Sequence, residues 1–455
     1  MSQFLFDRGE CGPRSPAEVA GEADTDLAGT PRLRVPQRTQ IEMHWASLDE
    51  LLDEDHPARM VWEAVCKLQL GAWLREIKAV EGQCGRDATD PRLLVAIWVY
   101  ATLDGQGSAR QIARLCEKHL AYQWLCGGVT VNHNMLSAFR CQEGEKWDAL
   151  LTQMVAALMA EGLVELRQVA QDGMRVRASA GKDTFRRQRR LEECLEEARG
   201  QVETLKQLAD DSPELTRRQQ VAREQAACER LARIESAIRN CDELKQQRQA
   251  SAEKSGRDPK EPRASTTDPE AREMKMPDGG TRPAYNVQFS TDTQSGIIVG
   301  VDANNQGSDQ QQLPPMLDQI QERYGQVPEE ALVDGGFASK DTIDGAAARG
   351  CTVYAPLKQE EKQLAEGKNP YARKPGDSPA VEAWRGRMGT AEARATYQMR
   401  CQTAEWVNAQ ARNRGLQQFR VRGQAKCRIV ATLLAIAHNL VQALTLRAKA
   451  AQMAT

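Results

Sequence analysis

Apolar residues recur at helical spacing through the first third of the chain, from about residue 41 to residue 162. Asp90 followed by Pro91 is typical of a helix start, because aspartate caps the first turn and proline fits the first helical position. The pattern predicts an all-helical N-terminal domain over residues 41–162. Residues 1–40 are rich in Gly, Pro, Asp and Arg without an apolar period, which predicts a mobile tail.

The helices predicted within this domain are short. Ser108 and Gln111 have the spacing of a capping box, and the pair Gly127-Gly128 breaks the chain before a further short helix. This order of short helices fits a helix-turn-helix-like DNA-binding unit, and it equally fits a plain helical bundle.

The period then changes. Residues 169–176 read as a first strand, and residues 184–255 carry apolar positions spaced alternately three and four apart, which is a heptad seam. Residues 210–213, of sequence DDSP, interrupt the seam, so we expect an antiparallel helical hairpin. The hairpin could pack only on itself, or it could pair two protomers or clamp DNA. The polar, proline-containing residues 251–283 are predicted to form a loop.

Beyond this loop the alternation becomes that of strands. Residues 285–289 and 297–301 form a predicted hairpin, and helices then alternate with strands that end near residues 334 and 354. This order predicts an α/β domain over residues 163–450, a mixed sheet flanked by helices, interrupted by a helical-hairpin insertion and linker at 184–283. Its last part, from about residue 391, is helical.

Charge is balanced over the whole chain but not within it. The 455 residues hold 61 Lys or Arg and 63 Asp or Glu, for a net charge of −2, which points to no anionic partner. From Arg385 to the end, however, twelve Lys or Arg face only Glu392 and Glu405, a net charge of +10. Basic character is therefore concentrated in the C-terminal helical region.

Three features narrow the class of protein further. The twelve cysteines include no CxxC pair, which argues against a structural zinc site and favours reduced thiols. The apolar stretch at 429–446 is broken by polar residues, so no membrane span is expected. The N-terminus has no secretory pattern, and we expect a cytoplasmic protein.

Three carboxylates are the candidates for chemistry. Asp172 and Asp334 each precede a glycine at the predicted end of an apolar strand, and Glu405 lies in the basic region with Arg412 two helical turns further on. Taken singly, the aspartates could be turn residues and the glutamate part of a solvated helix face. Together, with no nearby His or Cys, they would form a hard oxygen site suited to two Mg²⁺ or Mn²⁺ ions, as in phosphodiester chemistry.

Two further polar residues are predicted to be structural. His438 lies within the last apolar helix and is expected to be a hydrogen-bonded helix residue rather than a ligand. Asp309 precedes the helix that contains Met316, and we expect it to be the N-cap of that helix.

Several ordered motifs resemble bacterial insertion-sequence transposases of the DDE class, in the branch with an N-terminal helical domain before an RNase H-like catalytic domain. The N-terminal motifs are SLDELLDEDHPAR (47–59), DPRLLVAIWVYA (90–101), SARQIARLCEKHLAYQWLCGG (108–128) and HNMLSAFR (133–140). The catalytic motifs are QDGMRVRA (171–178), AYNVQ (284–288), VDGGFAS (333–339), YQMRCQTAEWVNAQAR (397–412), RVRG (420–423) and AHNL (437–440).

This resemblance implies that Asp172, Asp334 and Glu405 are the family's metal-binding catalytic carboxylates. It also implies that a basic and aromatic set contacts DNA, namely Tyr397, Arg400, Arg412, Arg420 and Arg422. The implied partners are the double-stranded terminal inverted repeats and target DNA, bound by a homodimer near the nucleoid. The implied activity is metal-dependent strand cleavage and strand transfer. Two alternatives are a catalytically silent DNA-binding or repressor derivative and a helical scaffold protein.

Overall fold

The computed structural model describes residues 45–80, 87–208, 217–256, 258 and 260–453. It divides into two units, Met1–Leu51 and Leu52–Thr455, and the first contributes one described helix, α2 (Leu48–Leu51). The mobile tail predicted for residues 1–40 and the interruption at 210–213 both lie outside the described residues.

The N-terminal part of the larger unit is helical, as predicted. Asp90 caps α5 through a hydrogen bond from the Arg92 backbone N–H (2.8 Å), and Trp98 and Trp147 are fully buried in the core. Ser108 occupies the N-cap of α6 but makes no capping hydrogen bond, so the predicted capping box is wrong. The helices are α3 (Pro57–Cys66), α4 (Gly71–Leu74), α5 (Pro91–Leu103), α6 (Ala109–Lys118), α7 (Leu120–Cys126), α8 (His133–Gln142) and α9 (Gly144–Ala160).

A mixed six-stranded sheet forms the second part, with strand order β4-β5-β1-β7-β8 and β6 paired to β5. Strand β1 is central: it runs antiparallel to β5 and parallel to β7, which in turn pairs in parallel with β8. The strands are β1 (Gln168–Arg177), β4 (Arg272–Lys275), β5 (Thr281–Asp292), β6 (Ile298–Asn304), β7 (Glu330–Val333) and β8 (Thr352–Tyr354); β2 (Phe185–Arg186) and β3 (Ala264–Ser265) pair separately.

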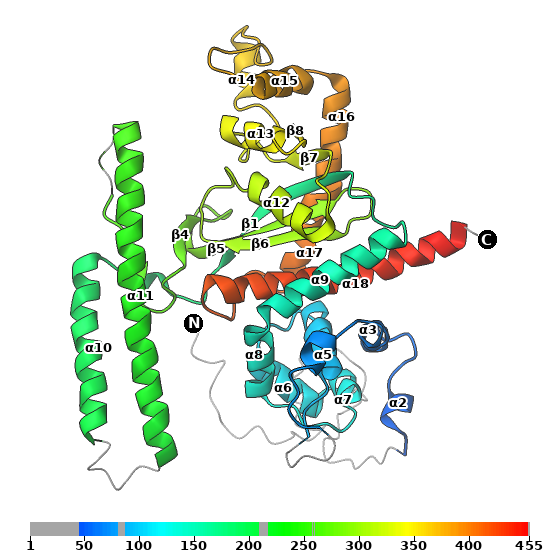
Figure 1. Cartoon of the computed structure of the whole chain (residues 1–455), viewed down its shortest axis with the longest axis vertical. Helices are drawn as coiled ribbons and strands as arrows, with labels where there is room; N and C mark the ends of the chain where they lie inside the picture. The colour runs from blue at the N-terminus through cyan, green and yellow to red at the C-terminus, as the bar shows by residue number, and fades with distance from the viewer. Residues whose placement is uncertain (1–44, 81–86, 209–216, 257, 259, 454–455) are drawn as a thin grey trace, which may run out of the picture. The chain divides into compact units, whose positions relative to one another are not determined.

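Helices flank this sheet (Figure 1), which confirms the predicted mixed sheet with helices around it. They are α12 (Leu313–Tyr324), α13 (Lys340–Ala347), α14 (Glu360–Ala365), α15 (Pro379–Met388), α16 (Ala391–Arg400), a π-helical turn (Cys401–Glu405), α17 (Trp406–Asn413) and α18 (Gln424–Met453).

The long helix α18 packs between the sheet, at β6, and the N-terminal helices α5 and α9 (Figure 1). By length and composition alone it could span a membrane, since an 18-residue stretch of it has a mean hydropathy of 1.8, but 67% of that stretch is buried inside the protein. His438 donates to the Gly296 carbonyl (3.0 Å), and the Asn439 amide pairs with both backbone groups of Ile298 (2.8 Å each). His438 is therefore a buried, hydrogen-bonded helix residue, as predicted.

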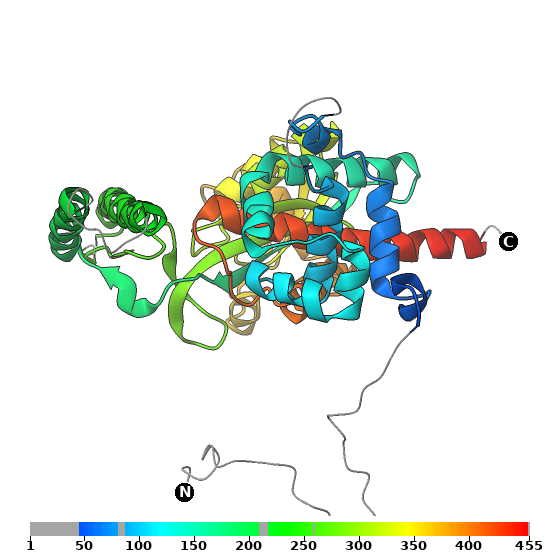
Figure 2. The ribbon, with the colours of Figure 1, turned by 90° about the horizontal axis from the view of Figure 1, so that it is seen from below.

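Two helices project between β2 and β3, namely α10 (Gln188–Leu208) and α11 (Arg217–Ser255), and they lie side by side in Figures 1 and 2. They are antiparallel, because Arg230 of α11 donates to Gln201 of α10 (2.9 Å) while Leu191 packs against Cys241. The prediction of a loop at 251–283 is wrong, since this interval holds the end of α11, β3, β4 and the start of β5. Within β4 only Met274 is buried. The sequence of this edge strand is therefore mostly polar and resembles that of a loop.

Candidate active site

Asp172 lies in the middle of β1, not at its end as predicted. The parallel pairing of β1 with β7 ends at the pair Gln171 and Val333, so Asp172 and Asp334 are the next residues of the two neighbouring strands. The topology therefore brings these two carboxylates side by side from positions 162 residues apart. Strand β7 ends at Val333, and Asp334 turns away from it, accepting a hydrogen bond from the Gly336 N–H (3.2 Å).

Asp172 is held on three sides. Its carboxylate accepts hydrogen bonds from the Gly173 backbone N–H (2.9 Å) and the Asn408 side-chain amide (2.9 Å), and pairs with Arg400 (3.1 Å). Burial raises the pKa of Asp172, Arg400 and the Gly173 N–H oppose that shift, and the negative charge of Asp334 adds to it. Asp334 is therefore close enough to act electrostatically on Asp172.

Arg400 connects Asp172 to Glu405. Its side chain is 9% exposed, and its guanidinium pairs with Asp172 through one terminal nitrogen and with Glu405 through the other (2.9 Å). Burial opposes its charge, but the negative groups around it, with Asp172 first, raise its pKa.

The π-helical turn at Cys401–Glu405 explains the contact between Arg400 and Glu405. In a regular α-helix, residues five apart point in directions about 140° apart, whereas a π-turn widens the coil so that they align. The turn lies against β1, with Ala404 packed on Ala170 and Leu332. The helix irregularity thus directs Glu405 toward Arg400, which also contacts Asp172.

The oxygens of Asp172, Asp334 and Glu405 suit a hard divalent cation, because carboxylates are the ligands that such ions prefer. In this structure the Arg400 guanidinium lies between two of these carboxylates, Asp172 and Glu405. In the part of the chain that the structure describes, no three His, Cys, Asp or Glu side chains lie close enough together to hold a metal ion. The carboxylates therefore fit such a cation in chemistry, while the Arg400 guanidinium occupies the space between Asp172 and Glu405.

Asp309 lies behind the site and is not the helix N-cap that its position in the sequence predicts. The N-cap of α12 is Gln312, and Asp309 instead accepts hydrogen bonds from Asn286 (2.7 Å) and Gln288 (2.8 Å) and pairs with Arg175 (3.3 Å). These partners belong to β1 and β5, on the face of the sheet opposite to Asp172, because side chains alternate along a strand.

Gly173 makes this approach possible. A Cβ atom on Gly173 would lie 2.2 Å from the Asp309 carboxylate, which is closer than any real contact. Asp309 is thus seated directly behind the residue next to Asp172. An Asp-Gly pair in a sequence suggests a turn, so no sequence signal indicated this contact.

The predicted DNA-contacting residues are in different surroundings. Tyr397 is half-buried near the site; burial raises its pKa, Arg400 lowers it, and Asp334 raises it. Arg400 is engaged by carboxylates. Arg412, Arg420 and Arg422 are exposed, and the Arg422 guanidinium donates to the Ser179 carbonyl (3.3 Å).

Comparison with known proteins yields two family matches. Residues 258–440 match a family described as "Transposase DDE domain", and residues 46–142 match one described as "Transposase domain (DUF772)". Asp334 and Glu405 fall within the first match, whereas Asp172 lies before it, on the other side of the α10–α11 insertion. No curated protein and no solved structure matches the chain.

Proposed function

This chain belongs to the insertion-sequence transposases of the DDE class, and we propose that it binds the terminal inverted repeats of its own element and catalyses metal-dependent DNA strand cleavage and strand transfer. The observation that carries the catalytic part is the Arg400 guanidinium held between Asp172 and Glu405, with Asp334 beside them. Arg400 thus contacts Asp172 and Glu405 and is influenced by the charge of Asp334, although the three carboxylates come from distant parts of the chain.

In this proposal Asp172, Asp334 and Glu405 hold two Mg²⁺ or Mn²⁺ ions. Such ions, when bound, activate an attacking oxygen and stabilise a leaving oxygen in phosphodiester chemistry. Asn408 and the Gly173 N–H orient the Asp172 carboxylate, so that its oxygens keep one direction whatever cation faces them. Arg400 supplies positive charge to the site before the ions bind, which limits the mutual repulsion of the carboxylates.

We propose that DNA is bound by the helix-turn-helix-like domain at 41–162 and by the basic C-terminal segment. Within that segment Arg412, Arg420 and Arg422 would contact phosphates and Tyr397 a sugar or base near the site. Support comes from the exposure of the three arginines and from the +10 net charge beyond residue 385. A local basic surface is sufficient for affinity, because counterion release depends on the charges at the interface.

The strand order supports an RNase H-like catalytic domain over residues 163–450. Leaving aside the edge strand β4, the order is β6-β5-β1-β7-β8, with the first three strands antiparallel and β1, β7 and β8 parallel. The insertion at 184–283 adds the α10–α11 hairpin between β1 and β5. We propose that this hairpin is an antiparallel coiled coil and that two protomers act together on DNA; size-exclusion chromatography with light scattering, with and without DNA, tests the dimer.

The test of catalysis uses Asp172→Asn, Asp334→Asn and Glu405→Gln, each assayed for cleavage of DNA carrying the element's ends in Mg²⁺ or Mn²⁺. An amide keeps the shape of the side chain but loses the anionic oxygen that the cation needs, so cleavage should be lost while a gel shift on the same preparations still shows binding. Glu392→Gln is the matched control, because Glu392 is the other glutamate of the basic segment and is exposed at the start of α16.

Full cleavage by any one of the three variants would exclude that residue from catalysis. Wild-type protein that binds the ends but never cuts them would instead favour a silent DNA-binding derivative. Loss of both binding and cleavage in a variant would point to misfolding.

A further inference from the structure

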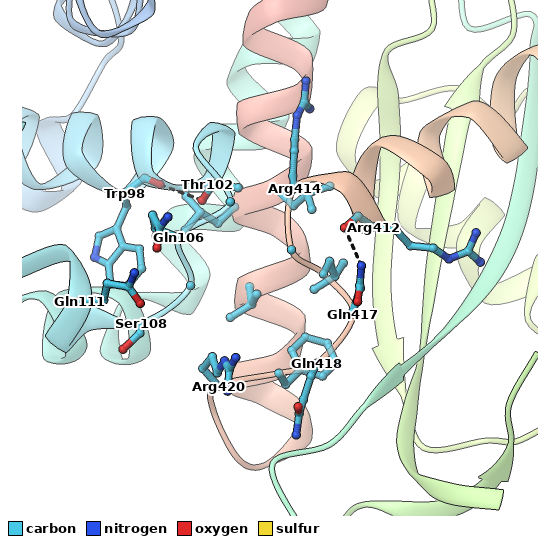
Figure 3. Close-up of a pocket in the computed structure, with 18 of the residues that line it drawn as sticks. Trp98, Thr102, Gln106, Ser108, Gln111, Arg412, Arg414, Gln417, Gln418 and Arg420 are labelled. Carbon is cyan, nitrogen blue, oxygen red and sulfur yellow. Dashed lines mark hydrogen bonds between the residues drawn. The ribbon is translucent and has the colours of Figure 1, made fainter. Parts of the chain in front are cut away.

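A cavity of about 580 Å³ lies where the loop after α17 meets the N-terminal helices and α18 (Figure 3). Its floor is apolar, with Leu433 and Leu434 of α18, and its walls carry side-chain amides. Five arginines line it, and no acidic residue does: Arg140, Arg177, Arg412, Arg414 and Arg420. We call it the arginine cavity.

Arg140 is the most unusual of the five because it is a buried cation for which the described part of the chain supplies no carboxylate partner. It is 5% exposed, its guanidinium stacks over Trp98 at 4.2 Å, and one terminal nitrogen donates to the Gly107 carbonyl (2.9 Å). Its Nε–H is buried without a hydrogen-bond partner, and burial lowers its pKa. A buried charge of this kind is costly unless an anion approaches it.

The other arginines of the cavity also lack acidic partners. Within the described residues, none of the five forms an ion pair with a carboxylate, and a second buried donor, Nη1 of Arg414, is unpaired. Arg420 runs along Gly107, whose carbonyl Arg140 contacts, so these two side chains converge. Figure 3 shows Arg420 near Ser108, whereas the Arg412 side chain points from the cavity toward the sheet.

The cavity is rigidly connected to the candidate active site. The end of β1 is tied to the loop by two backbone hydrogen bonds, from Arg177 to Gln417 (3.1 Å) and from Phe419 to Arg177 (2.8 Å). Helix α17 joins the two places directly, because its Asn408 holds Asp172 and its last turn begins the cavity wall. From Glu405 to Arg412 the helix rises about 10 Å, at ~1.5 Å per residue, which is the length of about three base pairs at ~3.4 Å each.

We propose that the arginine cavity binds a backbone phosphate of DNA a few nucleotides from the phosphodiester that faces Asp172, Asp334 and Glu405. This inference rests on the proposed function, since it assumes that the protein binds DNA. A phosphodiester supplies the anionic oxygens that Arg140 and Arg414 lack, and a guanidinium fork suits it better than any neutral group. The neutral amide side chains and the apolar floor can contact the sugar next to this phosphate.

The experiment measures binding of a short fluorescein-labelled duplex by fluorescence anisotropy between about 50 and about 200 mM KCl. Arg420→Gln removes one exposed charge of the cavity, and Arg414→Gln can be added to it. The buried position is tested with Arg140→Lys, which keeps the charge but loses the planar fork of the guanidinium. This variant is preferred to Arg140→Gln because removing the buried charge altogether can prevent folding. Arg349→Gln is the matched control, because Arg349 is paired with Asp318 (2.6 Å) and does not line the cavity.

Arg420→Gln should weaken binding about tenfold and lower the slope of log affinity against log salt by about one. Arg140→Lys should weaken binding at each salt concentration with little change of slope, because the charge remains. Arg349→Gln should change neither quantity. In a parallel thermal-shift assay, the duplex should stabilise the wild-type protein at concentrations where inorganic phosphate does not.

Wild-type affinity and slope in both Arg420→Gln and Arg140→Lys would overturn the assignment of the cavity while leaving DNA binding itself intact. Stabilisation by inorganic phosphate equal to that by duplex would also overturn it, since the cavity would then be a site for a free anion. Absence of duplex binding by the wild-type protein would instead refute the proposed function.

Discussion

Replacing Gly173 by alanine tests the packing behind the candidate active site. An added Cβ would lie 2.2 Å from an Asp309 carboxylate oxygen, 2.4 Å from the Gln288 amide nitrogen and 2.9 Å from the Asn286 amide oxygen. Asp309 would have to withdraw, and in withdrawing it would weaken or lose the hydrogen bonds from Asn286 and Gln288. Because the Gly173 N–H donates to the Asp172 carboxylate (2.9 Å), a shift of β1 at this point would also disturb Asp172.

The magnitude follows from these contacts. Overpacking a tight site costs about 1–3 kcal/mol, and a hydrogen bond to a charged group contributes about 1.5–3 kcal/mol. Alanine in a strand recovers only about 0.5–1 kcal/mol relative to glycine. Since Asp309 can keep part of its hydrogen bonding after a shift, we expect Gly173→Ala to lower the free energy of unfolding by about 2–4 kcal/mol.

The assay is urea unfolding followed by circular dichroism, together with Mg²⁺-dependent cleavage. Gly200→Ala is the control, because Gly200 lies within α10 with no atom within 4 Å of an added Cβ; it should gain about 1 kcal/mol. Shortening the acid in the double variant Gly173→Ala/Asp309→Ser should recover part of the loss. A Gly173→Ala protein with wild-type stability and cleavage would refute the role assigned to Asp309.

Three further outcomes are expected. Arg400→Met should raise the pKa of Asp172 further, because the guanidinium charge now opposes the effect of burial, so the acid limb of the pH–rate profile for cleavage should move to higher pH. Burial lowers the pKa of His438 to about 4, so the unfolded state takes up the proton first as the pH falls; the free energy of unfolding should drop by up to about 3 kcal/mol between pH 6.5 and 4, and His438→Gln should remove that part of the dependence in urea unfolding. Chelation with EDTA should abolish cleavage of the element's ends, leave duplex binding in a gel shift intact, and be reversed by added Mg²⁺; cleavage in EDTA would exclude a divalent cation from the reaction.

The sequence alone determined the local features of this protein. The helices before residue 162, the hairpin of β5 and β6, and the strands that end at Val333 and Tyr354 follow from apolar spacing and turn residues, which act over a few neighbouring positions. Such patterns also selected Asp172, Asp334 and Glu405 by residue type. They failed at β4, where an edge strand with one buried side chain has the composition of a loop.

Contacts between distant residues were decided only by the tertiary structure. Asn408 meets Asp172 across 236 positions, Arg400 pairs with the same carboxylate, and a π-turn lets Arg400 reach Glu405 as well. Asp309, which has the sequence position of a helix cap, faces Gly173 instead, because strand pairing brings Asn286 and Gln288 within its reach. Local spacing contains no information on these partners, since they depend on which strands pair, in which register, and on which backbone groups burial leaves to be satisfied.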